Sequence, residues 1–359
     1  MTSEGGRRTD RRRRSPGPTV GRVEGDRATA ESAPDLDGVL IVRKPVGPTS
    51  HDVVALVRRL ATTRRVGHGG TLDPFASGVL PIFLGHATRI VEYHMGDRKA
   101  YRATVCFGAS SATDDLEGEL TPVPGPPVTR SAVGSALDGF RGEIVQVPPA
   151  YSAVKVAGRR AYALARAGKA PEIAPRTVTI HRLEMTDWDE TDAERPIAIV
   201  EVECSAGTYV RALARDLGVA LGSAAYLGAL ERTASGPFRI ESAVALDDLR
   251  PGGREAIAGH LLPVDTGLDA LAVVEIDVAG LEAIRRGQRV ADPAGPGGGT
   301  GDEDVPALVR VCEPGGGLVA IGRRAGGWVA PVKVLVEAPT PSGAARSGGH
   351  RGRRAHPGA

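Results

Sequence analysis

The pattern of apolar positions predicts ordered structure from residue 38 onward. Residues 38–42, GVLIV, form a short apolar run that is typical of a buried strand. Ser50 stands before a segment whose apolar residues recur at helical spacing, so it is predicted to cap a helix. Residues 101–107 alternate apolar and polar side chains, which indicates a half-buried strand.

The middle of the chain contains further helical and extended patterns. Helices are predicted at 86–95 and 131–140, and strands at 177–184 and 197–204. Another helix follows, with these apolar residues on one face: Val210, Leu213, Leu217 and Leu221. Helices and strands in no regular alternation indicate an α+β fold.

The pattern changes from about residue 270. Short apolar strands separated by Gly and Pro turns predict a small β-barrel or sandwich. The strands read VVEI, ALVRVC, LVAIGRR and WVAPVKVLVE, and a Gly-rich loop lies at 292–304. Both chain ends have the composition of disordered tails. The predicted organisation is therefore a tail at 1–36, a domain at 37–265, a second domain at 266–338 and a tail at 339–359.

Net charge does not indicate a partner by itself. The whole chain carries +2, while residues 1–36 contribute +2 and residues 341–359 contribute +4, which leaves about −4 for the middle. Only a local basic patch could therefore bind nucleic acid there. Residues 151–182 contain such a patch, with seven Lys or Arg against one acid and with Tyr151 and Tyr162 interleaved. That composition suits phosphate contacts with occasional base stacking, and Arg159 and Arg160 are the leading candidates.

Cysteine usage and the lack of apolar runs narrow the class of protein. Cys106, Cys204 and Cys312 lie far apart without a CxxC pair, which argues against a zinc site or a disulfide framework and fits a reducing cytoplasm. No apolar run approaches the roughly 20 residues needed to span a bilayer. The sequence also contains no Walker loop, no HExxH and no GxSxG motif.

Residues 67–89 carry the strongest chemical signal. This segment, GHGGTLDPFASGVLPIFLGHATR, places Asp73 before a proline and after two glycines. Pro74 disfavours the helical conformation for the residue before it, and Gly69 and Gly70 allow a close backbone approach. Asp73 is therefore expected on an ordered turn. An isolated Asp-Pro pair is usually a structural turn, so the surrounding string decides its interpretation.

The string G-H-x-G-T-L-D-P-x-A-x-G-x-L-P closely resembles the catalytic motif of the tRNA pseudouridine synthase B family, which isomerises the T-loop uridine at tRNA position 55. Four further segments resemble that family in the same order. They are Lys44-Pro-Val-Gly-Pro-Thr-Ser50, Lys99-Ala-Tyr-Arg, Cys204-Ser-Ala-Gly-Thr-Tyr-Val-Arg211 and Leu230-Glu-Arg-Thr-Ala-Ser-Gly-Pro-Phe238. Arg43 stands where family members often have Asp.

The resemblance assigns roles to individual residues. It implies that Asp73 is the nucleophile, that Arg211 pairs with it, and that Tyr101 stacks on the base. Tyr209 and Leu230 would wall the uracil pocket, Lys44 would lie beside the nucleophile loop, and His68 would contact the RNA. If the chain is still extended at 209–211, Tyr209 and Arg211 project to one side. Each residue taken alone also has an ordinary structural reading.

The resemblance implies a pseudouridine synthase catalytic domain with a mixed, mainly antiparallel sheet, followed by a PUA-like RNA-binding domain. The expected partner is the T-arm of tRNA. No metal, organic cofactor, membrane or obligate protein partner is expected, and the chain is expected to act as a monomer in the cytoplasm. Two alternatives remain: a guide-dependent synthase acting on ribosomal RNA, and a non-catalytic RNA-binding protein on the same scaffold.

Overall fold

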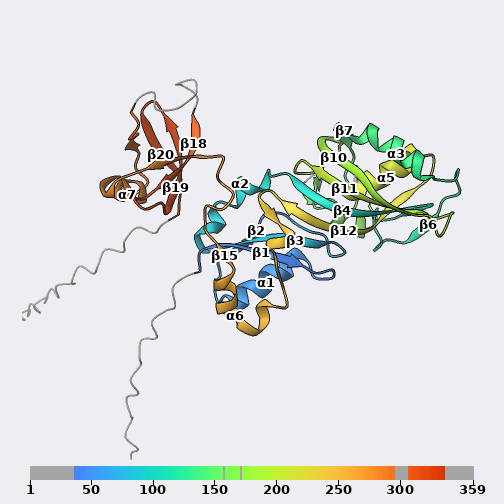
Figure 1. Ribbon diagram of the computed structural model, residues 1–359, viewed down its shortest axis with the longest axis horizontal. Helices are drawn as coiled ribbons and strands as arrows, with labels where there is room; N and C mark the ends of the chain where they lie inside the picture. Colours follow the sequence, from blue (N-terminus) through green and yellow to red (C-terminus); the bar gives the residue numbers. More distant parts are fainter. Residues whose placement is uncertain (1–35, 157, 170–171, 296–305, 336–359) are drawn as a thin grey trace, which may run out of the picture. The chain divides into compact units, whose positions relative to one another are not determined.

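A computed structural model describes residues 36–156, 158–169, 172–295 and 306–335 (Figure 1). The predicted tails lie outside the described residues, except for Leu36, and so does most of the 292–304 loop. No helix within the described ranges is long and apolar enough to cross a membrane.

An eleven-stranded mixed sheet organises residues 38–262. Its main path runs β14 (Val244–Ala245), β1 (Gly38–Lys44), β3 (Ser77–Leu84), β12 (Ala225–Ser235), β4 (Lys99–Phe107), β11 (Ile197–Cys204), β10 (Arg176–Asp189) and β7 (Gly142–Gln146). Three short strands lie off this path, namely β2 (Val66–His68), β13 (Phe238–Arg239) and β15 (Leu261–Leu262). Most neighbours are antiparallel, as predicted, while β1 with β14 and β12 with β3 are parallel.

Side-chain alternation explains why these segments form strands. Every second residue of β11 is buried, as the sequence IAIVEVEC requires. Strand β3 instead buries nearly all its residues, and it lies in the middle of the sheet between β1 and β12. The Asp73 motif, residues 67–81, runs into this buried strand, so its last residues are the first residues of β3.

Four amphipathic helices pack their apolar faces against the sheet core: α1 (Ser50–Leu60), α3 (Arg130–Leu137), α5 (Val210–Ala220) and α6 (Leu249–Gly259). Helices α3 and α5 contact each other, as do α1 and α6 (Figure 1). The predicted cap of α1 was wrong by one residue. Thr49 is the N-cap and forms a capping box with Asp52, while Ser50 is the first helical residue and is fully buried.

The remaining short elements of this body connect the strands. They are the 3₁₀ turns Gly85–Arg89, Asp138–Phe140 and Ile240–Ser242, helices α2 (Val91–Met95) and α4 (Ala161–Arg166), and strands β5 (Ala109–Ser111), β6 (Leu120–Pro122), β8 (Lys155–Val156) and β9 (Arg159–Arg160). The helix predicted at 86–95 is thus split into a 3₁₀ turn and α2.

The C-terminal region forms a separate five-stranded sheet, curled into a half-barrel. Its order is β16 (Ala272–Glu275), β18 (Ala307–Cys312), β19 (Leu318–Ala325), β20 (Trp328–Val334) and β17 (Val290–Ala291). The four long strands were predicted. Helix α7 (Val278–Arg285) was not predicted, although Asp277 caps it through the Gly280 N–H and Leu281 and Ile284 bury its inner face.

Candidate active site

Backbone hydrogen bonds close the Asp73 turn, residues 69–76, which connects β2 to β3. The Gly69 N–H donates to the Pro81 carbonyl at 2.9 Å, and the Ala76 N–H donates to the Asp73 carbonyl at 3.1 Å. The Gly47 N–H donates to the Pro74 carbonyl at 2.8 Å, which ties the turn to the loop after β1. The backbone on either side of Asp73 is therefore fixed by neighbouring segments.

Ser50 fixes the residue immediately before the nucleophile candidate. Its hydroxyl donates to the Leu72 carbonyl at 3.0 Å and accepts from the Leu72 N–H at 2.8 Å. Because the Ser50 side chain is fully buried, water does not compete for these two bonds. The start of α1 is thereby locked to the Asp73 turn.

Lys44 is fully buried and bonds only backbone carbonyls. Its ammonium donates to Pro45 at 2.8 Å, to Pro48 at 2.9 Å and to Pro74 at 3.4 Å. Burial lowers the pKa of Lys44 to about 8, while the negative charge of Asp73 opposes that shift. Lys44 therefore holds the residue after Asp73 and places a positive charge near the carboxylate.

Arg232 holds the other side of the turn. Its guanidinium donates to the carbonyls of Val79 at 2.7 Å, Thr71 at 3.2 Å and Gly70 at 3.2 Å. The side chain is 1% exposed. Arg232 lies within the Leu230 motif, but the resemblance assigns it no role. Its position two residues after buried Leu230, on the same face of β12, is the signal that could have identified it.

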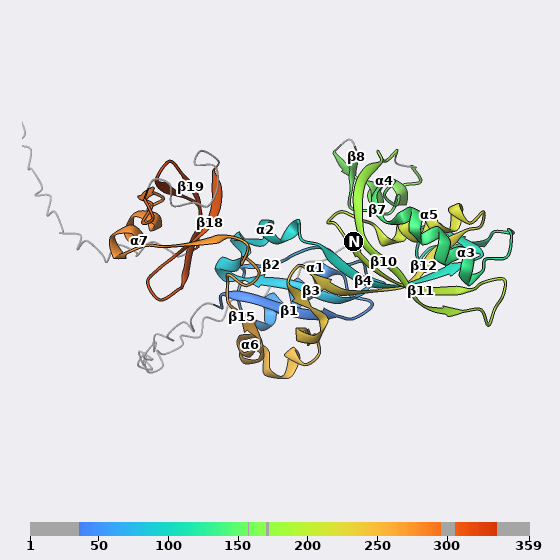
Figure 2. The ribbon, with the colours of Figure 1, turned by 45° about the horizontal axis from the view of Figure 1, so that its top comes forward.

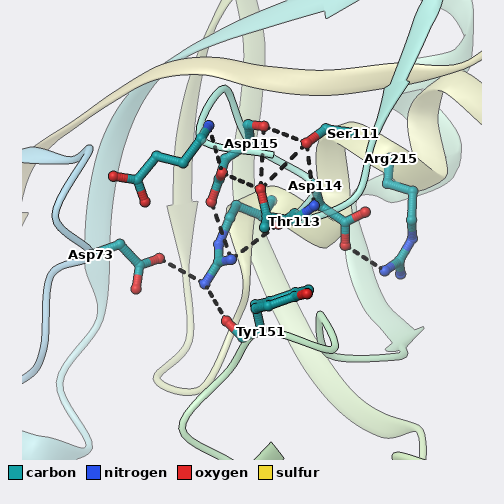
Figure 3. Close-up of polar contacts among 9 residues, drawn as sticks. Asp73, Ser111, Thr113, Asp114, Asp115, Tyr151 and Arg215 are labelled. Carbon is teal, nitrogen blue, oxygen red and sulfur yellow. Dashed lines mark hydrogen bonds and ion pairs between the residues drawn. The ribbon is translucent and has the colours of Figure 1, made fainter. Parts of the chain in front are cut away.

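Arg211 reaches Asp73 from α5. Its Nη2 lies 2.9 Å from Asp73 Oδ2, and the side chains are 6% and 37% exposed respectively. Figure 3 draws this contact as the dashed line that leaves the Asp73 carboxylate. The guanidinium also donates to the carbonyls of Thr113 and Tyr151, each at 3.1 Å. The ion pair implied by the motif is therefore present, and Asp73 keeps a solvent-accessible side.

The chain is extended at Tyr209 but not at Arg211, so the condition under which the two side chains would project to one side is not met. Helix α5 begins at Val210, so Arg211 is helical, while Tyr209 is the extended N-cap residue. Buried Gln146 fixes this junction, because its amide accepts from the Tyr209 N–H at 2.8 Å and donates to the Tyr209 carbonyl at 3.0 Å. The Arg176 guanidinium covers the Tyr209 ring at 4.6 Å from its centroid. Arg211 thus reaches Asp73 from the first turn of α5.

A second carboxylate, Asp115, was missed by sequence reasoning. Its Oδ2 lies 3.2 Å from Arg211 Nη1, and the residue is 2% exposed. Its Oδ1 accepts from the Thr113 hydroxyl at 2.5 Å and from the Glu117 N–H at 3.0 Å. Arg211 therefore bridges a half-exposed and a buried carboxylate. The signal was the string Thr-Asp-Asp-Leu-Glu-Gly at 113–118, where adjacent acids enter a turn.

Tyr101 and Leu230 lie on the neighbouring strands β4 and β12. Tyr101 pairs in register with Arg232, and Leu230 pairs with Ala103. Burial raises the pKa of Tyr101, and the positive charge of Arg232 opposes that rise. Leu230 is buried within the main apolar cluster, against which Tyr101 packs. Both residues thus lie near the centre of the sheet, close to the Asp73 turn.

His68 ends β2 beside the turn. Its Nδ1 accepts from the Gly70 N–H at 3.3 Å, and its ring meets the ring of His51 edge-on at 5.5 Å. Burial lowers the pKa of His68, so the ring is neutral near pH 7, in agreement with an Nδ1 that accepts a hydrogen bond. Arg43, which stands where the family often has Asp, forms an exposed ion pair with Glu231 at 2.9 Å.

The predicted basic segment, residues 151–182, is divided by the fold: its described residues up to 169 form an arm in the connection between β7 and β10, whereas residues 176–182 belong to strand β10 of the sheet (Figure 2). The arm contains the β8–β9 hairpin and α4. Arg159 and Arg160 are exposed on the hairpin, away from the contacts that hold Asp73. The arm meets the site at its first residue, where the Tyr151 carbonyl accepts from Arg211. In the described part of the chain, no cluster of three or more His, Cys, Asp and Glu side chains could hold a metal ion.

Two family models match consecutive parts of the chain, and both describe pseudouridylate synthases. The model of the N-terminal domain of the TruB family of pseudouridylate synthases matches residues 58–210. The model of the tRNA pseudouridylate synthase B C-terminal domain matches residues 211–269. Asp73 and Asp115 lie in the first match, and Arg211 begins the second.

Individual relatives extend this match over most of the chain. A tRNA pseudouridine synthase B from Arthrobacter sp. (strain FB24) is 44% identical over 311 residues, which is 84% of this chain and 97% of that protein. A protein of the same name from Bradyrhizobium diazoefficiens is 45% identical, over 71% of this chain and 75% of its own length. A chain of a solved Cbf5–Nop10–Gar1 complex is 28% identical with a TM-score of 0.62, over 84% of this chain and 85% of that chain. The chain therefore belongs to the TruB family of pseudouridylate synthases.

Proposed function

We propose that this protein is an isomerase that converts the T-loop uridine at tRNA position 55 to pseudouridine, with Asp73 as the nucleophile. The observation that carries the mechanism is the contact between Arg211 Nη2 and Asp73 Oδ2 at 2.9 Å. It places a half-exposed carboxylate, which a substrate can reach, beside a buried cation. Relatives named tRNA pseudouridine synthase B support the choice of RNA and of reaction.

The reaction exchanges one bond to the ribose for another. The N1–C1′ bond of uridine breaks, the uracil turns, and a C5–C1′ bond forms. The proton on C5 is lost and N1 gains one, so there is no net oxidation or reduction and no water is consumed. The reaction therefore requires no cofactor. It requires one nucleophile, a pocket that retains the detached base, and a nucleotide turned out of its stack at a cost of about a few kcal/mol.

Asp73 must be ionised to act as a nucleophile. Arg211 and Lys44 supply positive charge on two sides of the turn, next to the carboxylate. Since Lys44, Ser50 and Arg232 bond the turn's backbone, the carboxylate is held in place before the substrate binds. Such preorganisation reduces the reorganisation needed in the transition state.

The neighbouring side chains are suited to holding a flipped uracil. Tyr101 would stack on the base, while Tyr209 and Leu230 would wall the pocket. Tyr101 lies on β4, Tyr209 is the N-cap residue of α5, and Leu230 lies on β12. These three elements meet near the Asp73 turn. His68, with a neutral ring at the end of β2, would contact the RNA next to the flipped nucleotide.

Substrate binding is assigned to the arm and to the C-terminal region. Arg159 and Arg160 are exposed on the arm's hairpin, where they would contact phosphates of the T-arm. The proposed boundaries are a catalytic domain at 37–265 and a PUA-like RNA-binding domain at 266–338. We further propose that the protein acts as a monomer, without an obligate protein partner, in the cytoplasm. The free thiols of Cys106, Cys204 and Cys312 are consistent with that compartment.

A guide-dependent activity is the second candidate, because a chain of the Cbf5–Nop10–Gar1 complex has the same fold over 84% of this chain. The relatives named tRNA pseudouridine synthase B are more similar, at 44% and 45% identity, and therefore favour direct tRNA modification. A non-catalytic RNA-binding role is disfavoured, because the ionic contacts around Asp73 would serve no purpose there.

The test is tritium release from C5-labelled uridine. An unmodified tRNA transcript labelled at uridine C5 is incubated with the purified protein, without guide RNA, metal or cofactor. We expect release of one tritium per tRNA and none from a transcript with cytidine at position 55. Absence of release that is restored by a guide RNA would support the second candidate instead.

A further inference from the structure

Two adjacent aspartates pair with two arginines that lie one turn apart on α5. Asp115 Oδ2 lies 3.2 Å from Arg211 Nη1, and Asp114 Oδ2 lies 2.8 Å from Arg215 Nη1 (Figure 3). Residues four apart on a helix lie on the same face. The turn that carries both aspartates, residues 111–117, is thus docked on α5 by two parallel ion pairs. The Arg211–Asp115 pair, called the inner pair, contacts Asp73 through Arg211, whereas the Arg215–Asp114 pair, called the outer pair, does not contact it.

The backbone of Asp114 is unusual. Its φ is +62°, a left-handed conformation that side chains other than Gly, Asn and Asp rarely adopt. Its carbonyl accepts from the Leu227 N–H at 3.1 Å, and its N–H donates to the Ser111 carbonyl at 3.2 Å. This conformation sets the direction in which the next residue, Asp115, leaves the turn. Holding Asp114 in place therefore also orients the buried carboxylate that contacts Arg211.

Arg215 connects the same turn to a third segment. In addition to Asp114, it donates to the Val147 carbonyl at 2.9 Å and to Asp216 at 2.9 Å. Val147 lies in the same stretch as Tyr151, whose carbonyl accepts a hydrogen bond from Arg211. The outer pair thus joins α5 to both stretches that supply partners to Arg211. Asp114 and Arg215 are 15% and 29% exposed, so the pair is partly shielded from water.

We propose that Asp114 and Arg215 are positioning residues for the isomerisation. They hold the 111–117 turn against α5 so that Asp115 and the Thr113 carbonyl fix the guanidinium of Arg211 against Asp73. Neither residue touches Asp73, and the substrate does not need to contact them. This inference rests on the proposed roles of Asp73 and Arg211. It predicts that loss of the outer pair slows the chemical step while tRNA affinity stays intact.

Substitutions at Asp114 separate its charge from its backbone conformation. Asp114→Ala loses the carboxylate and disfavours the left-handed conformation, so we expect the single-turnover rate at saturating tRNA to fall about 10- to 100-fold. Asp114→Asn keeps the size and tolerates φ above zero, so its loss should be smaller. Asp114→Gly keeps the conformation accessible but has no side chain to hold Arg215, so it should lie between the two.

Substitutions at Arg215 test the other partner. Arg215→Met should lower the single-turnover rate to a similar extent, and Arg215→Lys should recover part of that loss because it retains one charged contact. The double variant Asp114→Asn with Arg215→Met should cost little more than either single change, because both remove the same pair. The matched control is Arg141→Met, which removes an ion pair to Asp138 and hydrogen bonds to the Leu183 carbonyl, outside the contacts of Asp73 and Arg211. That variant should keep the wild-type rate.

Three measurements are made on each full-length variant: the single-turnover rate of tritium release at saturating tRNA, the Kd for tRNA, and the thermal midpoint. A slower rate with wild-type Kd, at a temperature where the variant is fully folded, supports positioning. A wild-type rate for both Asp114→Ala and Arg215→Met overturns it, whatever the change in midpoint. Asp73→Asn is measured in parallel: if it remains active, the proposed function itself fails, whereas an inactive Asp73→Asn beside an active Asp114→Ala removes only the positioning role.

Discussion

The Asp73 turn and the basic arm are built in opposite ways. The turn is bonded by buried polar groups from β1, α1, α5 and β12, namely Lys44, Ser50, Arg211 and Arg232. The arm has a two-residue-strand hairpin and one short helix, and its Arg159 and Arg160 are exposed. One region fixes a single side chain, and the other presents exposed positive charge.

This difference follows from what each region does in the proposed function. A nucleophile must be held within a fraction of an ångström, and buried hydrogen bonds supply that precision. Phosphate contacts act through charge and tolerate flexible side chains, because their contribution comes largely from counterion release. Changes at the turn should therefore alter the rate of chemistry, and changes on the arm should alter affinity. The predictions below test that separation, beginning with the largest expected effect.

Arg211 is one of the residues that support the Asp73 turn, and Arg211→Lys should strongly reduce the rate of the reaction. Lysine keeps a positive charge but cannot bond Asp73, Asp115 and two carbonyls at once. We expect a fall of about 10²- to 10³-fold in the single-turnover rate, with Kd for tRNA near the wild-type value. A wild-type rate in Arg211→Ala would show that this arginine does not support the chemistry.

Lys44 should make the turn sensitive to alkaline pH. Its pKa of about 8 lies below the ordinary value of 10.5, so the folded protein loses this proton while the unfolded chain still keeps it. Between these values the unfolded state binds more protons, and the contribution of Lys44 to the free energy of unfolding therefore rises with pH. The rate should change in the other direction, because the neutral amine has fewer donors for the carbonyls of Pro45, Pro48 and Pro74.

The measurement compares the wild type with Lys44→Met between pH 7 and 10. Single-turnover rates of the wild type should decline as the pH rises through about 8. Lys44→Met should be slower throughout and should lack that decline. Identical pH profiles for the two proteins would exclude Lys44 as the titrating group.

The arm should respond in affinity and hardly in rate. Replacing Arg159, Arg160 and Lys169 with Ala should weaken tRNA binding, and each lost phosphate contact should reduce the salt slope of binding by about one unit. The single-turnover rate at saturating tRNA should change only slightly. Exposed Arg250→Ala, on α6 and outside the basic patch, serves as a control for removal of surface charge. An unchanged salt slope in the triple variant would mean that the arm does not bind phosphates.

Much of the fold was predictable because its strands and helices are strongly patterned. Strands β4, β10 and β11 and helices α1, α3 and α5 occur close to where the apolar spacing placed them. Helix α7 was missed because its segment is short and lies among Gly-rich turns. The start of α5 at Val210 agrees with the helical spacing, whereas the contact of Gln146 with the Tyr209 backbone, 63 residues away in sequence, could not be derived from spacing.

Residues of the site could be predicted only where they lie within a continuous sequence motif. The proximity of Asp73 and Arg211 was implied by resemblance, and the structure contains that contact. Asp115 and Arg232 were missed because the sequence signals beside them do not show that their charges are buried. Their burial depends on partners from other strands and helices. The roles of Tyr101, Tyr209, Leu230 and His68 toward the base remain predictions.

Asp73→Asn tests the central claim, that the carboxylate of the Asp73 turn carries out the chemistry. The substitution is nearly isosteric and removes only the anion. We measure C5 tritium release at saturating tRNA in a single turnover, together with Kd for the same transcript. The account predicts no detectable release and a Kd close to that of the wild type. Release within about tenfold of the wild-type rate, which corresponds to about 1.4 kcal/mol of activation free energy, would contradict it.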